Sequence, residues 1–446
     1  MKKVSLLLVL VLLVSLLTAC GGTKEETVEA TETPAVEETK EEVKEEAVVE
    51  EKVEEPVAEV STEPLQMLWW SDGTEGEVMQ TILDAFKAET GIEIQLVVLA
   101  YDDYAAKLKT MIRGGEAPAL IRATEGTIME FKDFLLPLDE TFAAADFTNV
   151  FFNKDGKAVT LPMDVTANGL FVNFDLLDKY GVKYPKLGDK PWTWAEFETE
   201  MAKLKGKDDV AFPGVFDNKA HRFMPMVYQF GGKMWENAFD TSGLTSDAAV
   251  EALTTLQRMN TDGTLDPAVW AGGAKPNELF QTGKYGFHMS GNWFVAAYQE
   301  LTFKWGVVPM PVGNGETATR STIIGGKGIC AVQDSGLEKE ALQFITYLAK
   351  PENHDKFAAG VPFLSPRLAA KLDFGVYQSV YEVFQDELAN TPAENVLDWQ
   401  NMITVVGIYP VINTGIEACM GGDDPKETLE RLAAEIDALV VEQGLK

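Results

Sequence analysis

The chain reads LQMLWW at residues 65–70, IEIQLVVL at 92–99 and ALI at 119–121. These apolar runs have the length and composition of strands. Between them, apolar residues recur every three or four positions over 78–86 and 104–112, as on one face of a helix. Strands that alternate with helices form a parallel sheet with crossover helices. The sequence therefore predicts an α/β fold.

Glycines and capping residues mark the ends of these helices. Gly91 stops the first helical pattern and residues 114–115 stop the second, because glycine closes a helix in the left-handed conformation. Asp102 or Asp103 is placed to cap the start of the second helix. The run 92–99 becomes continuously apolar toward its end, which predicts a strand buried on both faces.

In open α/β sheets, ligands bind beside the carboxyl ends of the strands. Trp70 and Asp72 follow the first predicted strand, Tyr101 follows the second and Glu125 follows the third. An aromatic ring can cover the apolar face of a sugar, and a carboxylate can accept hydrogen bonds from its hydroxyl groups. We expect these four side chains in a ligand-binding cleft; a helix cap, a turn or a packed ring is the alternative for each.

Helix signals continue in the second half of the chain. Thr193 and Glu196 have the spacing of a capping box, for a helix that runs to Lys205. Asp424 followed by Pro425 predicts the start of the last helix. The apolar stripe of this last helix contains Leu429, Leu432, Ile436 and Leu439.

The N-terminus has the pattern of a secretory signal. A basic start is followed by an apolar run over 4–17, shorter than the roughly 20 residues that span a bilayer. Leu17, Ala19 and Cys20 then resemble a bacterial lipobox. We expect 1–19 to be a lipoprotein signal peptide and Cys20 to carry the acyl chains that anchor the protein to a membrane. An ordinary signal with an incidental cysteine is the alternative.

Residues 20–63 are expected to form a tether. The stretch 24–63 contains 16 Glu, 4 Lys and no aromatic residue, so it cannot bury enough apolar surface to offset the entropy lost on ordering. Repulsion between like charges extends such a chain. We expect an acidic, disordered spacer between membrane and body, with a solvated helix around 37–55 as the alternative.

The composition excludes several function classes. The net charge of −32 argues against nucleic acid, which proteins bind through faces rich in Lys and Arg. The three histidines are scattered, and the sequence lacks the spacings of metal-binding and phosphate-binding motifs. It therefore predicts no metal and no cofactor. Besides Cys20, the chain has Cys330 and Cys419, whose apolar surroundings favour two buried free thiols over one disulfide bridge.

An ordered set of motifs points to one family. PWTWAEF at 191–197 matches the pattern P-x-T-W-x-E-F, and 280–293 matches F-x-x-G-k-x-x-M-x-x-x-G-x-W except that Phe287 stands at the Met position. These motifs resemble the extracellular solute-binding proteins, the family that includes the maltose- and multiple-sugar-binding receptors. Where many relatives carry Pro-Asp before the third strand, this chain has Ala119 after the proline. Further matching segments are 161–173, 230–232, 245–256, 262–263, 305–311, 325–326 and 341–345.

The resemblance implies a two-lobe periplasmic-binding-protein-like fold, with crossings between the lobes near 161–170 and 320–326. It also implies a receptor rather than an enzyme. Such a receptor closes its lobes around a solute and delivers it to the permease subunits of an ABC importer. We expect a monomer and a sugar or oligosaccharide ligand. The lobes would comprise 64–163 plus 325–362 and 164–324 plus 363–446.

The resemblance also supplies site residues. The family places a stacking aromatic at the position of Trp293, directly after Asn292. Asp164 lies at the first crossing, where its carboxylate could reach a hydroxyl group. The alternative for Trp293 is a core tryptophan, and the alternative for Asp164 is a solvated hinge residue. The remaining candidates are Trp235 and Trp399 as aromatics of the second lobe, and Arg367 for an acidic ligand. For Arg367 the alternative is pairing with a surface acid.

Other functions are open at this point. A peptide, polyamine or metal chelate would use the same fold as a sugar. A surface glycoside hydrolase would need two carboxyl groups about 5–10 Å apart. A sensor or chaperone partner would use the fold without a transporter. The many aromatic residues favour a sugar over a small ion.

Overall fold

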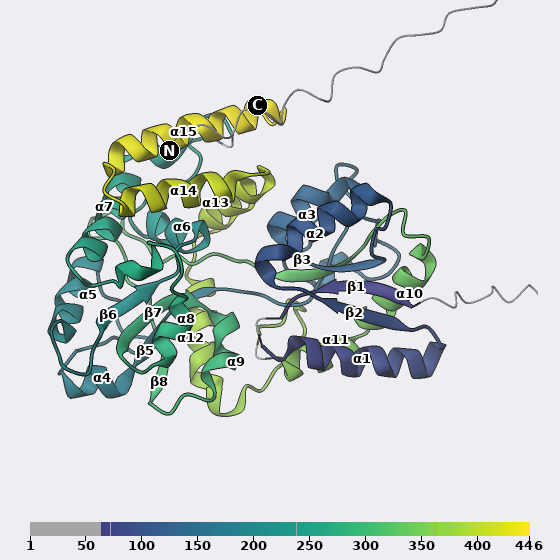
Figure 1. Ribbon diagram of the computed structural model, residues 1–446, viewed down its shortest axis with the longest axis horizontal. Helices are drawn as coiled ribbons and strands as arrows, with labels where there is room; N and C mark the ends of the chain where they lie inside the picture. The colour runs from purple at the N-terminus through teal and green to yellow at the C-terminus, as the bar shows by residue number, and fades with distance from the viewer. Residues whose placement is uncertain (1–63, 72, 238, 362) are drawn as a thin grey trace, which may run out of the picture. The chain divides into compact units, whose positions relative to one another are not determined.

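The computed structural model describes residues 64–71, 73–237, 239–361 and 363–446 (Figure 1). The predicted signal peptide, Cys20, the tether and Asp72 lie outside the described residues. The described chain forms two sheets, each sandwiched between helices through its own hydrophobic cores. This arrangement confirms the predicted α/β class with two lobes.

The sheet of the first lobe has the strand order β2-β1-β3-β9-β4. β1 runs parallel to β2 and β3, whereas β9 is antiparallel to β3 and β4. A strand from far along the chain therefore completes this sheet. Its strands are β1 (Leu65–Trp69), β2 (Ile94–Val98), β3 (Leu120–Thr124), β4 (Leu161–Pro162) and β9 (Lys327–Ala331).

Helices cover both faces of this first sheet. One core contains Met79, Phe344 and Phe357, and it joins the sheet to α1 (Glu75–Thr90), α10 (Glu338–Ala349) and α11 (Pro351–Gly360). A second core contains Tyr104 and Ile128, and it joins the opposite face to α2 (Tyr101–Gly114) and α3 (Glu125–Phe131). Short 3-10 turns follow at Lys132–Phe134 and Ala144–Asp146.

The predicted helix ends hold, but one predicted cap and one strand environment are wrong. Gly91 and Gly115 adopt φ of 77° and 73°, the left-handed values that close α1 and α2. Neither Asp102 nor Asp103 caps α2, which begins one residue earlier; both carboxylates lie in its first turn, where they favour the helix dipole. β2 is an edge strand rather than a buried one, and Val98 is 59% exposed.

The sheet of the second lobe has the order β6-β7-β5-β8. β7 runs parallel to β6 and antiparallel to β5, which is also antiparallel to β8. The strands are β5 (Asn168–Asn173), β6 (Phe212–Phe216), β7 (Tyr285–Gly291) and β8 (Trp305–Val308).

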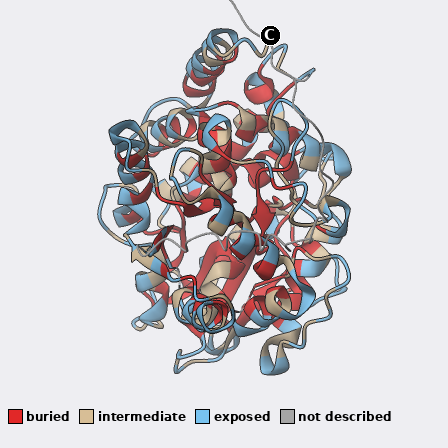
Figure 2. Ribbon diagram, turned by 90° about the vertical axis from the view of Figure 1, so that its right-hand side faces the viewer, coloured by how far each residue is buried: buried red, intermediate tan, exposed pale blue. Residues whose placement is uncertain are grey.

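Ten helices belong to the described part of this second lobe (Figure 1). The larger core packs one face of the sheet against α4 (Phe174–Lys179), α5 (Trp194–Met201), α6 (Ala220–Gln229), α7 (Asp247–Thr261), α13 (Ala393–Thr404), α14 (Ile408–Met420) and α15 (Pro425–Glu442). A smaller core packs the other face against α8 (Pro276–Gln281), α9 (Val295–Tyr298) and α12 (Gln378–Ala389). The interior is buried, and the outer helix faces are exposed (Figure 2). The 3-10 turns are Ala202–Leu204, Gly243–Thr245, Pro267–Val269, Asn292–Phe294 and Gly375–Tyr377.

The capping signals of this lobe are confirmed. Thr193 and Glu196 form both hydrogen bonds of a capping box at the start of α5. Asp424 accepts a hydrogen bond from the backbone of Glu427 at the start of α15. Leu429, Leu432 and Ile436 of the predicted stripe are buried, and Leu439 is partly buried.

Extended segments pair with one another between the two sheets. Val165 forms an isolated bridge with Leu364, and Thr166 forms one with Gly325. The backbone N–H of Met163 also donates to the carbonyl of Lys327 at 2.8 Å. The first crossing is thus paired with the second, and with a third segment that enters the second lobe near Leu364.

Two further sequence predictions concern the cysteines and membrane spans. Cys330 and Cys419 are both free and buried, which confirms the predicted thiols. Over the described ranges, no helix taken alone has the length and apolarity to cross a bilayer, although the bent pair α13 and α14 meets both criteria together.

Candidate ligand-binding site

Six polar and aromatic side chains gather where the connecting segments pass between the two sheets. They lie at strand ends, at the start of α3 or at the start of α6. Hydrogen bonds, ion pairs and ring contacts connect most of them. We call this set the interlobe cluster, and its members are Glu125, Asp164, His221, Arg222, Trp293 and Lys327.

Glu125 brings a carboxyl group to the cluster from the first lobe. It is the first residue of α3, whose N-cap Thr124 accepts a hydrogen bond from the backbone of Thr127 at 3.4 Å. Glu125 is only 5% exposed, and its Oε1 has no hydrogen-bond partner among the described residues. Burial raises the pKa of Glu125 to about 7, and nearby Asp164 adds to the rise. A buried oxygen without a protein partner suits a bound ligand.

Asp164 and Lys327 tie the first two crossings together. The backbone N–H of Lys327 donates to Oδ1 of Asp164 at 3.0 Å, and its Nζ lies 3.4 Å from Oδ2. The ammonium group also lies 4.0 Å from the ring centroid of Phe363. Asp164 is 1% exposed, so the alternative of a solvated hinge residue is wrong. The ion pair holds the hinge segments in register.

Arg222 is fixed from the second lobe by an acidic network. Its guanidinium pairs with Asp217 at 3.0 Å and donates to Oδ1 of Asn168 at 3.2 Å. Asp217 in turn accepts hydrogen bonds from Ser290 at 2.6 Å and contacts Nε2 of His288 at 2.7 Å. Burial alone would raise the pKa of Asp217, but His288 and Arg222 lower it below its usual range. The carboxylate of Asp217 is therefore ionised, and its negative charge balances the positive charge of Arg222.

Trp293 connects the two lobes. It follows β7 of the second sheet, yet its partly buried ring packs against the core of the first. The Cζ of Arg222 lies 4.3 Å from the ring centroid, a cation–π contact on one face. The His221 ring meets it nearly edge-on, with centroids 5.6 Å apart. An indole held in this way can cover the apolar face of a solute, so Trp293 stays a candidate for the predicted aromatic platform.

His221 links this platform to other aromatic rings of the second lobe. Its imidazole lies 5.3 Å from Trp399 in an edge-on contact, and Trp399 lies 5.9 Å from Tyr409. Tyr409 also reaches the first lobe, because a Cβ at Gly126 would lie 3.6 Å from its Cε2. The predicted aromatic Trp399 is thus next to the cluster, although it is itself buried.

The aromatic candidates of the first lobe differ in exposure. Trp70 is 2% exposed and packs between the guanidinium of Arg122, 4.7 Å from its ring, and the ring of Tyr104. It therefore takes the packed-ring alternative rather than the predicted cleft position. Tyr101 is 56% exposed, with its ring 5.5 Å from Trp70, and stays a candidate. Arg122 is buried and pairs with Glu75 at 3.2 Å.

Three other candidates have structural partners instead of open surface. Trp235 is 2% exposed in the core of the second lobe, and its backbone N–H donates to Asp398. Asn292 is fully buried; its amide accepts from the backbone of Ala167 and donates to the carbonyl of Val165. These contacts make Asn292 a clamp on the first crossing. The predictions that Trp235 and Asn292 line the cleft do not fit this packing.

Arg367 also forms an ion pair within the protein. Its guanidinium pairs with the carboxylate of Asp355 through Nε at 2.9 Å and through Nη2. This pairing with an acid is the alternative given for Arg367, and the predicted role in binding an acidic ligand does not fit it.

Sequence reasoning missed His221, Arg222 and Lys327. His221 and Arg222 lie in the first turn of α6, five and six positions after the end of β6, and Lys327 begins β9. The strand-end rule applied to the run 212–216 points to Asp217, which pairs with Arg222.

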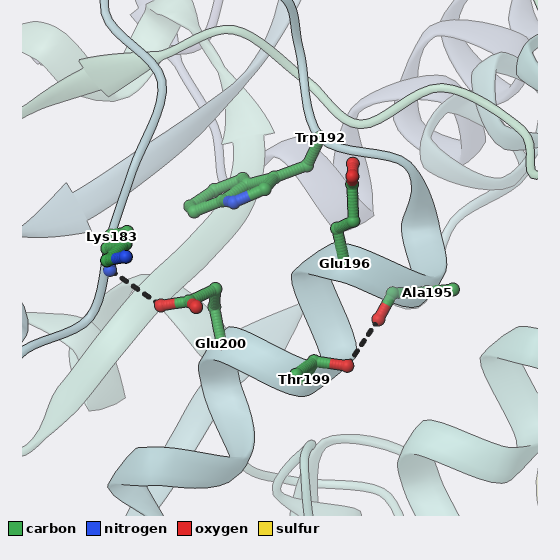
Figure 3. Close-up of a pocket in the computed structure, with 6 residues that line it drawn as sticks. All are labelled: Lys183, Trp192, Ala195, Glu196, Thr199 and Glu200. Atoms are coloured by element: carbon green, nitrogen blue, oxygen red, sulfur yellow. Dashed lines mark hydrogen bonds between the residues drawn. The ribbon is translucent and has the colours of Figure 1, made fainter.

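A separate open hollow of about 410 Å³ lies on the second lobe, beside the start of α5 (Figure 3). Its polar groups satisfy the local backbone. Glu196 accepts from the N–H of Thr193 at 2.7 Å, and Glu200 accepts from the N–H of Lys183 at 2.6 Å. The hollow therefore follows from helix capping, and none of its residues belongs to the interlobe cluster.

Comparison with known proteins gives a consistent family. The family model for bacterial extracellular solute-binding proteins matches residues 81–380. The sn-glycerol-3-phosphate-binding periplasmic protein of Pectobacterium atrosepticum is 22% identical, over 83% of this chain and 90% of the relative. The melibiose/raffinose/stachyose-binding protein of Bacillus subtilis is 23% identical, over 71% of this chain and 76% of the relative.

The fold is also found among solved structures. The ABC substrate-binding protein of Listeria monocytogenes in complex with cycloalternan superposes with a TM-score of 0.72. The two are 23% identical, and the match covers 86% of this chain and 99% of the other. With a family model that spans most of the body and a shared two-lobe fold, the chain belongs to the bacterial extracellular solute-binding proteins.

Proposed function

We propose that the chain is the receptor of an ABC importer for an uncharged sugar or oligosaccharide, which it binds at the interlobe cluster. The observation that carries this proposal is the position of Trp293. Its ring belongs to one lobe, packs on the other, and is stacked on Arg222. An apolar platform surrounded by hydrogen-bonding groups matches a sugar, which has both an apolar ring face and a hydroxyl edge.

The charges near the site favour an uncharged solute. The cations that we assign to the site region are each paired with a carboxylate: Arg222 with Asp217, Lys327 with Asp164, and Arg122 with Glu75. An anion such as a phosphate ester would have to compete with these carboxylates and would lie near Glu125. Burying an uncompensated charge is costly, which favours a neutral sugar over a glycerol phosphate.

The same geometry supports hinge closure as the mechanism. The paired crossing segments are short, and the ion pair between Asp164 and Lys327 fixes them at the first lobe. We propose 64–163 plus 325–362 and 164–324 plus 363–446 as the two lobes that rotate about these segments. A solute that contacts both lobes binds the closed form better than the open form and so shifts the equilibrium toward closure.

Further parts of the proposal concern location and partners. Cys20 would carry the lipid anchor on the outer side of the cell membrane, and the acidic tether would hold the body away from it. The partners would be the permease subunits of the importer, with the protein acting as a monomer. The lipobox pattern and the tether composition support this placement.

A hydrolase is less well supported by the same residues. Glycoside hydrolysis needs two carboxyl groups free to act on the substrate. Glu125 has one unpartnered oxygen, but both oxygens of Asp164 are engaged by Lys327. Over the described ranges, no group of three or more His, Cys, Asp or Glu residues could hold a metal ion. We therefore propose a binding protein without catalytic activity or cofactor.

Thermal unfolding in the presence of candidate solutes tests the proposal. The purified full-length chain would be heated with maltotriose, lactose, raffinose, sn-glycerol 3-phosphate, spermidine and a tripeptide. A solute at 100 times its dissociation constant stabilises the native state by about 2.7 kcal/mol. We expect a rise in the unfolding midpoint with at least one sugar. A rise only with the phosphate ester, the polyamine or the peptide would refute the sugar assignment.

A further inference from the structure

Three polar side chains converge on Gly325 in the second crossing. A Cβ at this position would lie 2.6 Å from Oγ1 of Thr166, 2.8 Å from Oε1 of Glu125 and 3.2 Å from Nε2 of His221. Real Cβ atoms essentially never come within 3.0 Å of another atom, so any larger residue would clash with Thr166 and Glu125. Glycine therefore lets these three side chains approach one another closely. The three side chains come from the first crossing, the first lobe and the second lobe.

The proton positions on His221 follow from its neighbour. Nδ1 of His221 is hydrogen-bonded to Nη1 of Arg222. A guanidinium group can only donate, so Nδ1 must accept. Burial, reinforced by the charge of Arg222, lowers the pKa of His221 well below its usual value, so the ring is neutral. A neutral ring that accepts at Nδ1 carries its proton on Nε2, the nitrogen that faces Gly325.

Glu125 offers the complementary group at the same place. Its Oε1 is buried and has no hydrogen-bond partner in the described part of the chain. A donor, the Nε2–H of His221, and an acceptor, the Oε1 of Glu125, thus both lie next to Gly325. A hydroxyl group can accept from the first and donate to the second at once, whereas a phosphate or carboxylate oxygen can only accept.

We propose that His221 and Glu125 together bind one hydroxyl group of the solute and set the specificity for an uncharged polyhydroxylated compound. This inference rests on the proposed function and makes it more specific. An anionic group at this position would leave the ionised carboxylate of Glu125 without a donor. Sites built to hydrogen-bond a hydroxyl group discriminate strongly against a compound that lacks it, because the buried polar groups are then left unpaired.

The test is a double-mutant cycle on sugar affinity. Titration calorimetry of the full-length chain would use whichever of maltotriose, lactose and raffinose gives the largest thermal shift. The variants are Glu125→Gln, His221→Phe and the double mutant, with Glu116→Gln on the exposed surface as the control. Each single variant should bind the sugar at least about tenfold more weakly, since losing a hydrogen bond to a charged or buried group weakens binding by about this factor. The double mutant should lose little more than the weaker-binding single variant, since both residues hold one hydroxyl group.

The possible results separate this inference from the proposed function. Sugar binding that is unchanged in both single variants but lost in Trp293→Ala would overturn the inference and keep the proposed function. Losses that simply multiply in the double mutant would show two independent contacts, against the shared hydroxyl group. A wild-type chain that binds sn-glycerol 3-phosphate and no sugar would overturn both. Glu125→Gln preserves the shape of the side chain, and the unfolding midpoint of each variant checks that it is folded.

Discussion

Replacing Glu125 with glutamine should change how the stability of the protein depends on pH. The carboxyl group is buried, and its pKa rises from 4.5 to about 7 in the folded chain. Between these two values the folded state holds the proton and the unfolded state releases it. Stability therefore falls as the pH rises through this range. Glutamine has the same shape and no charge, so it removes this dependence.

The size of the effect follows from the shift. A group whose pKa moves from 4.5 to about 7 costs the folded state about 2–3 kcal/mol more at pH 8 than at pH 5. For a body of this length that unfolds as one unit, this corresponds to about 3 °C in the unfolding midpoint. Glu125→Gln should therefore gain about 3 °C over the wild type between pH 5 and pH 8.

Thermal unfolding of the full-length wild type and variant at half-unit pH steps is the assay. The difference between the two curves is used, because His221 and His354 have lowered pKa values and oppose the slope below pH 6.5. Asp164, Lys327 and Tyr409 also lie near Glu125 and are common to both proteins. A difference that stays constant across pH 5–8, as expected for the control Glu116→Gln, would refute the reasoning.

Three other predictions use separate parts of the structure. Trp293→Ala should abolish the stabilisation by sugar, whereas Trp293→Phe should retain part of it because a phenyl ring keeps an aromatic face. Thermal shift with maltotriose, lactose and raffinose measures this stabilisation. Equal stabilisation of the two variants would contradict the platform. Asp217→Asn should lower the free energy of unfolding by about 3 kcal/mol in urea titrations, because it leaves buried Arg222 without its ion pair; a change within 0.5 kcal/mol, roughly that of a surface substitution, would argue against the network. In a Cys20→Ser chain, Cys330 and Cys419 should react with a thiol reagent only after unfolding, since both are buried and burial raises the pKa of each to about 12; fast reaction of the native protein at pH 8 would contradict this.

The sequence predicted the first lobe well where the signal was local. The spacing of Val78 to Phe86 and the stop at Gly91 depend only on neighbours along the chain, and both hold. The environment of β2 could not be predicted in the same way. Whether an apolar strand lies at the centre or the edge of a sheet depends on the strand order, and β9 joins from far along the chain. Val98 is consequently exposed despite its apolar run.

The site was predicted less completely than the fold. Of the interlobe cluster, Glu125, Asp164 and Trp293 were predicted, from a strand end, the first crossing and a family motif respectively. Trp70 and Arg367 are residue types that suit a ligand site, but Trp70 packs against Arg122 and Arg367 pairs with Asp355. These partners are not neighbours in the sequence. His221 gains its importance from Arg222 beside it and from Glu125 across the lobes. Tertiary contacts of this kind are not encoded in any local spacing.

The most direct test of the central claim is titration calorimetry with the sugar that stabilises the full-length chain most. Trp270→Ala is the matched control, because Trp270 is also a partly buried tryptophan of the second lobe but contacts Phe216 instead of the interlobe cluster. We expect one sugar per chain in the wild type and in Trp270→Ala, and binding at least tenfold weaker in Trp293→Ala. Equal affinity in Trp293→Ala, or wild-type binding restricted to sn-glycerol 3-phosphate, would contradict the account.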